Sequence, residues 1–234
     1  MGISAGPSGV SDGLVFQLDA ANLRSYSGSG NTANGLVSGF GGTLVNGVGF
    51  TSSNNGSFFF DGSNDYINLP NSSNLLTFGT NPFSIEFWIY YTSESGIRTI
   101  LSNYSDYNTG YNTYFYLGVF TYQVLSMVNK VLLLGSSGNF INNTFGADIV
   151  VNQWTHIVFT RDGSTFICYK NGLQVSSVSQ SNNYSGVRST KIGGGVASIS
   201  TIVGNLPSMK LYNRALSATE VMQNFNAMRE RYNI

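Results

Sequence analysis

Residues 154–178 read WTHIVFTRDGSTFICYKNGLQVSSV, and this stretch decides the fold. Apolar residues recur at every second position, which is the pattern of β-strands. The dipeptides Asp162-Gly163 and Asn171-Gly172 tolerate positive φ at both central positions of a type I′ turn. We therefore predict three antiparallel strands joined by two tight hairpins, at about 154–160, 165–170 and 173–178.

Two-residue loops also fix which residues face each other. A loop at Asp162-Gly163 pairs Arg161 with Ser164, and this register predicts one apolar face made of Ile157, Phe159, Phe166, Cys168, Leu173 and Val175. On the reverse face the register places His156 beside Tyr169. We therefore expect no cysteine–histidine dyad, and we interpret Cys168 as a small core residue and His156 as a hydrogen-bonded strand residue.

Residues 83–90, FSIEFWIY, form the clearest further strand. Alternation assigns Phe83, Ile85, Phe87 and Ile89 to the core, and places Glu86, Trp88 and Tyr90 on the polar face. Apolar runs bounded by turn residues predict other strands at 14–18, 58–60, 66–69 and 209–212. The chain is therefore predicted to be all-β, a two-sheet antiparallel jelly-roll sandwich.

The C-terminal segment carries the signature of one short helix. Ser217 and Glu220 have the spacing of a capping box, and Leu216 with Val221 that of a hydrophobic staple. One apolar stripe then runs along the helix, made of Val221, Phe225, Met228 and Tyr232. Two interpretations stay open for this stripe: it packs on the chain's own sandwich, or it docks on a neighbouring subunit.

The chain of 234 residues is expected to form one domain. Residues 1–11 are small and lack periodicity, which predicts a flexible N-terminal arm. We expect the sandwich at 12–216 and the amphipathic helix at 217–234. No signal peptide is expected at the start, because a basic segment and an apolar segment are both missing there.

Charged residues make up 9% of the chain, and eleven basic side chains balance eleven acidic ones. Nucleic acids and anionic membranes are bound by clustered Lys and Arg, so we expect neither as a partner. No apolar run approaches the ~18 residues of a membrane span, so no membrane insertion is expected. A surface with few charges repels its own copies weakly, which favours a subunit of an assembly.

Several segments match a known pattern in order and spacing: 60–67 FDGSNDYI, 83–89 FSIEFWI, 152–163 NQWTHIVFTRDG, 169–172 YKNG, 192–194 IGG and 211–217 LYNRALS. They resemble the laminin-G-like members of the concanavalin A-like lectin and glucanase superfamily. Residues 206–209 read LPSM where many relatives carry two acidic residues, so a family contact at that place is in doubt.

The opening 12–22 DGLVFQLDAAN and the ending 220–226 EVMQNFN resemble the variant of this domain in tailed-phage structural proteins. The resemblance implies a non-enzymatic virion protein: a capsid decoration, neck or tail-fibre-associated subunit on the virion surface. Its partners would be other virion proteins and copies of itself. The alternative is a carbohydrate-binding lectin or adhesin module that recognises host-surface glycans.

A glycoside hydrolase needs two carboxyl groups that face each other across a cleft. In glucanase relatives they alternate along one strand, but here Glu86 is followed on its face by Trp88 and Tyr90. We therefore expect no enzyme activity, no catalytic residues and no cofactor. Asp61, Asn64 and Asp65 share a short turn, and we favour an ordinary turn there, with bound Ca²⁺ as the alternative.

Residues 104–114, YSDYNTGYNTY, alternate tyrosine with small polar residues. Aromatic faces stack on sugars while amides and carboxylates bind hydroxyls, so the segment is a candidate contact for glycans. A protein interface and a plain loop remain alternatives. The candidate residues are Tyr104, Asp106, Tyr107, Tyr111 and Tyr114.

Overall fold

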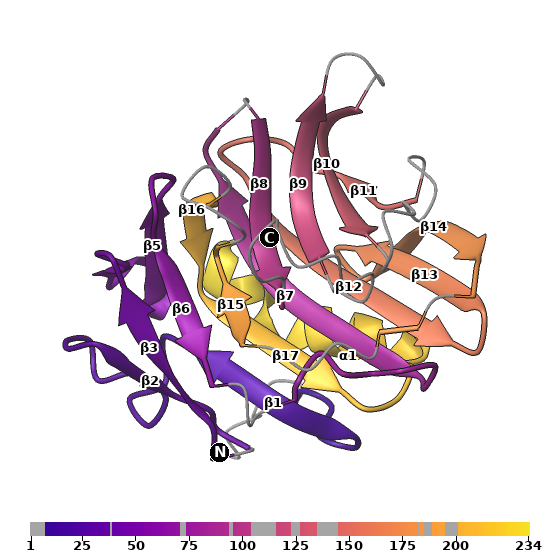
Figure 1. Cartoon of the computed structure of the whole chain (residues 1–234), viewed down its shortest axis with the longest axis horizontal. Helices are drawn as coiled ribbons and strands as arrows, with labels where there is room; N and C mark the ends of the chain where they lie inside the picture. The colour runs from indigo at the N-terminus through magenta and orange to yellow at the C-terminus, as the bar shows by residue number, and fades with distance from the viewer. Residues whose placement is uncertain are drawn as a thin grey trace, which may run out of the picture.

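The computed structural model describes residues 8–37, 39–70, 74–93, 96–103, 116–122, 127–134, 145–181, 183–184, 189–194 and 201–234. Over this part, the chain forms two large antiparallel β-sheets that pack face to face, with one α-helix near the C-terminus (Figure 1). The predicted fold class, an all-β two-sheet sandwich with a short C-terminal helix, is therefore confirmed. No helix of the described residues is long and apolar enough to cross a membrane.

The two sheets are named after their central strands. The β7 sheet contains β1 (Leu14–Asp19), β4 (Gly49–Thr51), β5 (Ser57–Asp61), β7 (Phe83–Tyr91), β12 (Trp154–Asp162), β13 (Thr165–Lys170), β14 (Leu173–Ser179), β16 (Val203–Leu206) and β17 (Ser208–Tyr212). The β8 sheet contains β2 (Thr32–Asn34), β3 (Gly41–Val45), β6 (Tyr66–Leu69), β8 (Gly96–Ser102), β9 (Tyr116–Tyr122), β10 (Met127–Leu134), β11 (Ala147–Asp148) and β15 (Thr190–Ile192).

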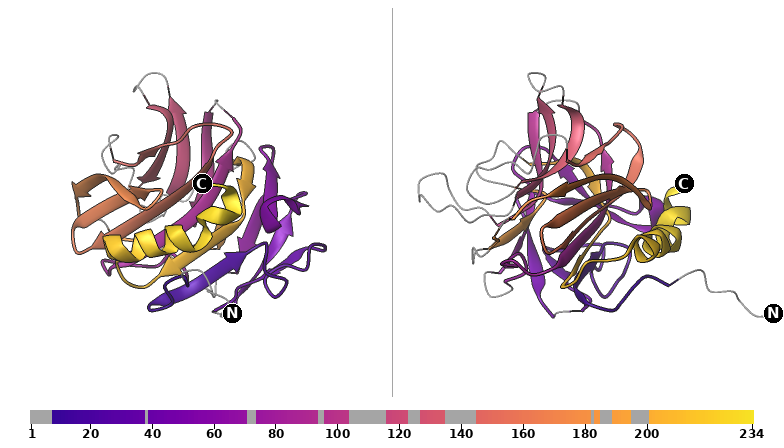
Figure 2. Two further views of the ribbon diagram at one scale, coloured as in Figure 1. Left: turned by 180° about the vertical axis from the view of Figure 1, so that it is seen from behind. Right: turned by 90° about the vertical axis from the view of Figure 1, so that its right-hand side faces the viewer.

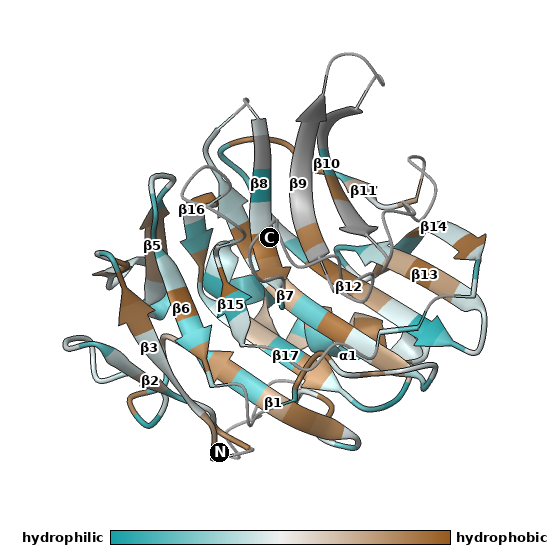
Figure 3. Cartoon of the chain, in the orientation of Figure 1, coloured by the Kyte–Doolittle hydropathy of each residue, from teal (hydrophilic) through white to brown (hydrophobic). Residues whose placement is uncertain are grey.

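Strand β7 organises its sheet. It pairs with β12 on one side and with both β17 and β16 on the other. Its predicted core residues Phe83, Ile85, Phe87 and Ile89 are all fully buried between the sheets. Hydrophobic and hydrophilic residues alternate along such strands (Figure 3), as expected when one face meets the core.

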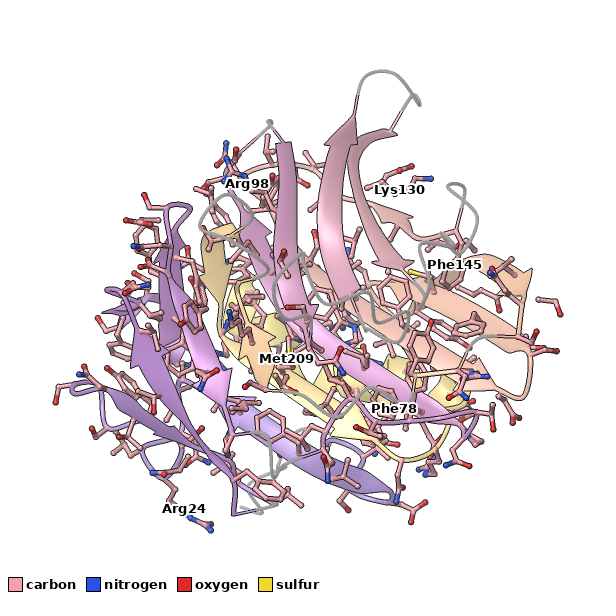
Figure 4. All side chains as sticks on the ribbon, in the orientation of Figure 1. Arg24, Phe78, Arg98, Lys130, Phe145 and Met209 are labelled. Carbon is pink, nitrogen blue, oxygen red and sulfur yellow. The ribbon has the colours of Figure 1, made fainter. Side chains whose placement is uncertain are left out.

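The interior between the sheets is one continuous hydrophobic cluster. Phe78, Phe145 and Met209 belong to it, while Arg24 points outward at the periphery (Figure 4). Phe78 stacks on Phe83 with ring centroids 4.1 Å apart. Aromatic side chains thus fill much of the space between the layers, as a chain without disulfides requires.

The predicted hairpin strands of 154–178 are confirmed, but the first register is wrong by two residues. Asp162 pairs with Thr165, so the turn residues are Gly163 and Ser164, and Phe159 lies opposite Cys168. Gly163 has φ of 58° and occupies the first central position, which fits a type II′ turn. Because the side-chain period is two, this shift leaves every residue on its predicted face.

The shift changes the neighbours of His156. Its backbone oxygen accepts a hydrogen bond from the N–H of Asn171 at 2.9 Å, so the predicted pairing with Tyr169 is wrong. In the second hairpin Lys170 pairs with Leu173, as predicted. A β-bulge after Cys168 then pairs Cys168 with Ser176.

The prediction that Leu173 and Val175 join the core is wrong. Leu173 keeps its predicted partner Lys170 but begins the edge strand β14, whereas Val175 lies at the bulge. An extra residue in one strand moves the side chains beside it out of register. Leu173 is 63% exposed and Val175 is 48% exposed, whereas Val178 packs against the core.

The C-terminal helix α1 (Ala218–Met228) continues into the 3₁₀ segment η5 (Arg229–Tyr232). The predicted capping box is present: the N–H of Ser217 donates to Glu220 Oε2 at 2.8 Å, and the N–H of Glu220 donates to Ser217 Oγ at 3.3 Å. The helix lies across the outer face of the β7 sheet (Figure 2).

The position of the helix decides between the two interpretations of its apolar stripe. Val221, Phe225 and Tyr232 are buried, and the half-buried Met228 packs in the same cluster as Phe225 and Tyr232. They contact Trp88, Trp154 and Val158 of the chain's own sheet. Val221, Phe225 and Tyr232 are therefore not available to dock on a neighbouring subunit, because they already pack against the chain's own sheet. For these three residues that alternative is wrong.

Candidate functional site

The helix covers only part of the outer face of the β7 sheet, and beyond its end a row of side chains lies open. Trp154 of β12 pairs with Tyr90 of β7, Tyr90 with Asn205 of β16, and Asn205 with Phe59 of β5. Directly paired residues in antiparallel strands point to the same face. Three aromatic rings and one amide therefore form a continuous line across four strands, which we call the aromatic row.

The aromatic row is the floor of a groove of about 410 Å³. Its walls come from β4, the end of β5 and the 3₁₀ turn η1 (Ser53–Asn55). The described residues that line this open groove are Thr51, Ser53, Asn54, Ser57, Phe59, Tyr90, Trp154 and Asn205.

The rings of the row are held in place and partly open to solvent. Tyr90 and Trp154 have ring centroids 5.2 Å apart at an angle of 53°. Trp154 also packs on Tyr232 of η5, with centroids 4.6 Å apart. Phe59, in the strand next to the edge strand β4, is 42% exposed.

Glycines shape the groove by allowing close approach of the strands. Gly204 has φ of 134°, and a Cβ there would overlap the backbone oxygen of Tyr90. Because Gly204 has no Cβ, β16 can lie against β7, and Asn205 comes to lie beside Tyr90. Gly49 faces Phe59 from β4 and carries no side chain that could cover the ring.

Arg231 ties the wall of the groove to the C-terminal segment. Its Nε donates to the backbone oxygen of Asn54 at 2.7 Å, and Asn54 Nδ2 donates back to the oxygen of Arg231 at 3.0 Å. The guanidinium also pairs with Asp19 at 2.9 Å and donates to the oxygen of Gly56. The wall is thus fixed by a residue that does not itself line the groove.

The other part of this face, under the helix, holds a buried ionic cluster around Glu86. Lys210 Nζ lies 2.9 Å from Glu86 Oε1, and His156 Nε2 lies 3.3 Å from the same oxygen. Asn224 Nδ2 donates to Glu86 Oε2 at 2.5 Å, and the hydroxyl of Tyr212 donates to it at 3.4 Å.

Glu86 was expected on a polar face, but it is 1% exposed. Burial alone would raise the pKa of Glu86, yet the Lys210 ammonium and the neighbouring imidazole of His156 outweigh it and lower this pKa to about 2. The carboxylate therefore stays ionised beneath the helix, where it joins β7, β17 and α1. Sequence reasoning missed this cluster, because Glu86 and Lys210 meet only when β7 pairs with β17.

The turn between β5 and β6 contains the calcium candidates Asp61 and Asp65. Asp65 Oδ2 accepts the backbone N–H of Asp61 at 3.1 Å, and Asp61 Oδ1 accepts the N–H of Ser63 at 2.8 Å. Burial and the charge of Asp61 raise the pKa of Asp65. In the described ranges no group of three or more His, Cys, Asp or Glu side chains gathers as metal ligands.

Cys168 has the predicted place in the core, whereas the tyrosine-rich candidate segment cannot be placed. Cys168 is buried in the core, and burial raises the pKa of its thiol far above the usual range, so the sulfur is unreactive. The tyrosine-rich segment with Tyr104, Asp106, Tyr107, Tyr111 and Tyr114 lies outside the described residues. Its assignment as a glycan or protein contact stays a prediction.

Comparison with known proteins agrees with the fold. The family model described as the concanavalin A-like lectin/glucanases superfamily matches residues 60–222, most of the chain. The chain belongs to this superfamily. No curated protein matches the sequence.

Solved structures with the same fold are distant in sequence from this lectin/glucanase-like chain. Domain 4 of the extracellular arabinanase AbnA from Geobacillus stearothermophilus, solved with arabinotriose, has a TM-score of 0.69 at 17% identity and covers 91% of this chain and 98% of its own. Trypanosoma rangeli sialidase in complex with sialic acid has a TM-score of 0.66 at 13% identity, covering 96% of this chain. The binding domain of botulinum neurotoxin serotype G has a TM-score of 0.63 at 17% identity, covering 91% of this chain.

The chain spans 34% of the sialidase and 50% of the neurotoxin binding domain, but nearly all of the arabinanase domain. At these identities the likeness shows the fold alone.

Proposed function

We propose that this chain is a non-catalytic carbohydrate-binding domain and that glycans bind in the open groove. The observation that carries the proposal is the aromatic row: Trp154, Tyr90 and Phe59 offer ring faces, and Asn205 places an amide between them. Ring faces contact the C–H surfaces of sugars, while amides and hydroxyls bind sugar hydroxyls.

The comparisons support this proposal without carrying it. The arabinanase domain that spans nearly the whole of this fold was solved with arabinotriose. A glycan role also explains why a row of aromatic side chains is left open beside a helix that buries the rest of the same face.

Glycan binding is tested by screening the full chain against an oligosaccharide array and measuring hits by calorimetry. We expect Trp154→Ala and Tyr90→Ala to lose binding. Tyr66→Ala is the matched control, because Tyr66 is also a half-buried aromatic strand residue but belongs to the β8 sheet. Binding that survives both groove variants would place the glycan elsewhere, and Tyr107→Ala would then test the tyrosine-rich segment.

Absence of catalysis is tested on the same ligands. The carboxylate of Glu86 is buried in an ion pair, which supports a binding role over hydrolysis. We expect oligosaccharides that bind to be recovered intact after prolonged incubation. Release of shorter sugars that Glu86→Gln abolishes would contradict the proposal.

A second candidate role is presentation of this domain on a virion, as a capsid decoration, neck or tail-fibre-associated subunit. It is supported by the resemblance of 12–22 and 220–226 to phage structural proteins and by the 9% of charged residues. Antibody labelling of purified particles in the electron microscope tests it. Labelled particles would support this role, and particles without the protein would contradict it.

A further inference from the structure

We infer that the open groove selects uncharged glycans and binds them without a metal ion. This inference rests on the proposed carbohydrate-binding function and specifies its ligand class. It follows from the side chains that line the groove and from the charges at its border.

None of the eight described lining residues carries a charge at neutral pH: Thr51, Ser53, Asn54, Ser57, Phe59, Tyr90, Trp154 and Asn205. Proteins that bind carboxylates or sulfates use Arg or Lys in charge-assisted hydrogen bonds. An anionic sugar entering this groove would lose water without gaining a cation, which is unfavourable. A neutral sugar can form hydrogen bonds with the hydroxyl and amide groups of the groove, and these replace its hydrogen bonds to water.

The cation behind the groove wall is already engaged. The Arg231 side chain is 11% exposed and pairs with Asp19 at 2.9 Å. Its Nε and Nη2 donate to the backbone oxygens of Asn54 and Gly56. With its N–H groups directed into the protein, Arg231 supplies little attraction to an anion in the groove.

The charge on the same strand beyond the row is negative. Asp61 follows Phe59 by two residues in β5, so it points to the same face, and it is exposed. Its carboxylate lies on the Val203 side of the row and repels an approaching anion. Arg98 Nη1 donates to the backbone oxygen of Gly62, the residue after Asp61, at 3.2 Å, so this border carries both charges and the selection rests on the uncharged lining.

Metal-bridged sugar binding requires carboxylate and carbonyl ligands that hold Ca²⁺ next to the sugar. The lining contains no carboxylate among the residues described, and Asp61 and Asp65 lie at the turn between β5 and β6, where one oxygen of each accepts a backbone N–H. Ring faces and direct hydrogen bonds remain as the means of binding. We therefore expect affinity that does not depend on calcium.

The row also sets the size of the ligand. Neighbouring strands lie about 4.8 Å apart, so a row across four strands is roughly 14 Å long. This matches a short oligosaccharide lying across the strands better than a single ring.

Matched pairs of sugars test the inference by calorimetry on the full chain: lactose against sialyllactose, and galactotriose against trigalacturonic acid, with arabinotriose and maltotriose as further neutral probes. We expect at least one neutral probe to bind and each acidic partner of a bound sugar to bind at least about tenfold more weakly. Excess EDTA is expected to leave the affinity unchanged within about twofold. Asp61→Asn should leave neutral binding unchanged and narrow the gap to the acidic partner.

Groove variants separate failure of the inference from failure of the proposed function. Phe59→Ser is used beside Trp154→Ala, because the exposed Phe59 can be replaced with less risk to folding. If both variants abolish binding, two results would still overturn the inference: acidic sugars that bind as tightly as their neutral partners, or affinity that is lost in EDTA. In either case carbohydrate binding in the groove would stand. No binding by any probe, or binding that neither variant changes, would overturn the groove as the glycan site.

Discussion

The outer face of the β7 sheet has two parts that begin from the same strand pattern and end in opposite roles. Trp88 and Trp154 lie on this face in neighbouring strands, one paired with His156 and the other with Tyr90. Trp88 is fully buried beneath Phe225 and Tyr232, with ring centroids 5.8 and 4.3 Å away. Trp154 meets only the end of the helical segment and stays partly exposed. The reach of the C-terminal helix therefore decides which aromatic residues become core and which stay open to solvent.

The chemistry of the two parts differs in the same way. The covered part pairs a buried carboxylate with the ammonium of Lys210, because a charge out of water needs a partner. The open groove avoids charge and keeps amides and hydroxyls exposed. The first arrangement favours stability of one packed state, and the second is the basis of the proposal that an uncharged ligand binds.

The largest expected effect separates the two tryptophans by stability. Trp88→Ala should lower the free energy of unfolding by about 3–5 kcal/mol, since it empties a fully buried site. Trp154→Ala should cost less, about 1 kcal/mol, because its side chain is only partly buried. Urea unfolding followed by circular dichroism measures both. Equal losses would show that the covered and open parts are not distinct.

Acid should weaken the covered part selectively. The folded-state pKa of Glu86 is about 2, below its ordinary value of 4.5, so its contribution to stability is complete above pH 4.5 and is lost as pH falls toward 2. Glu86→Gln should cost about 3 kcal/mol at neutral pH by leaving Lys210 unpaired, and the difference from the unchanged protein should shrink below pH 4.5.

The control for this experiment is Glu220→Gln. Hydrogen bonds from Arg214 lower the pKa of Glu220 to about 2 as well, but this carboxylate is partly exposed, so a smaller loss is expected at neutral pH. A Glu86→Gln variant whose deficit stays constant from neutral to acidic pH would contradict the ionised state of Glu86.

Arg231 joins the two parts, and its removal should affect both to a moderate degree. Arg231→Ala deletes the pair with Asp19 and the bonds to Asn54 and Gly56, for a loss of about 2 kcal/mol in unfolding free energy. Glycan affinity should fall as well, because Asn54 would no longer be fixed. Arg229→Ala is the matched control, since Arg229 is exposed two residues earlier. Loss of stability with unchanged affinity would show that the wall needs no support.

Local sequence signals predicted the elements of this fold well. The alternation in 83–90 located β7 and its core face, and Ser217 with Glu220 located the start of α1. These signals act within a few residues, so the sequence carries them directly. The hairpin register failed at Gly163 because two turn types compete for the same residues: Gly163 takes the first central position in place of Asp162, and Ser164 takes the second.

The groove and the buried cluster could not be read from local patterns. Phe59, Tyr90, Trp154 and Asn205 come from four distant segments and meet only through the pairing of their strands. Trp88 and Tyr90 lie on the same face of β7, and no nearby residue indicates that the helix covers the first and not the second. The residue that came nearest to marking the groove in the sequence was Gly204, the neighbour of Asn205, because a glycine permits the close contact between these strands.

The smallest expected effect on stability gives the sharpest test of the open part. Phe59 and Leu173 are both exposed apolar strand residues of the β7 sheet, 42% and 63% exposed. Replacing either by alanine should change the unfolding free energy by no more than about 1 kcal/mol, as for other surface positions. Only Phe59→Ala should weaken binding of a neutral oligosaccharide, because its ring lies in the aromatic row while Leu173 sits at the far edge of the sheet. If Leu173→Ala weakened binding equally, exposed apolar area in general would bind the sugar, and the alignment of rings across four strands would have no special role.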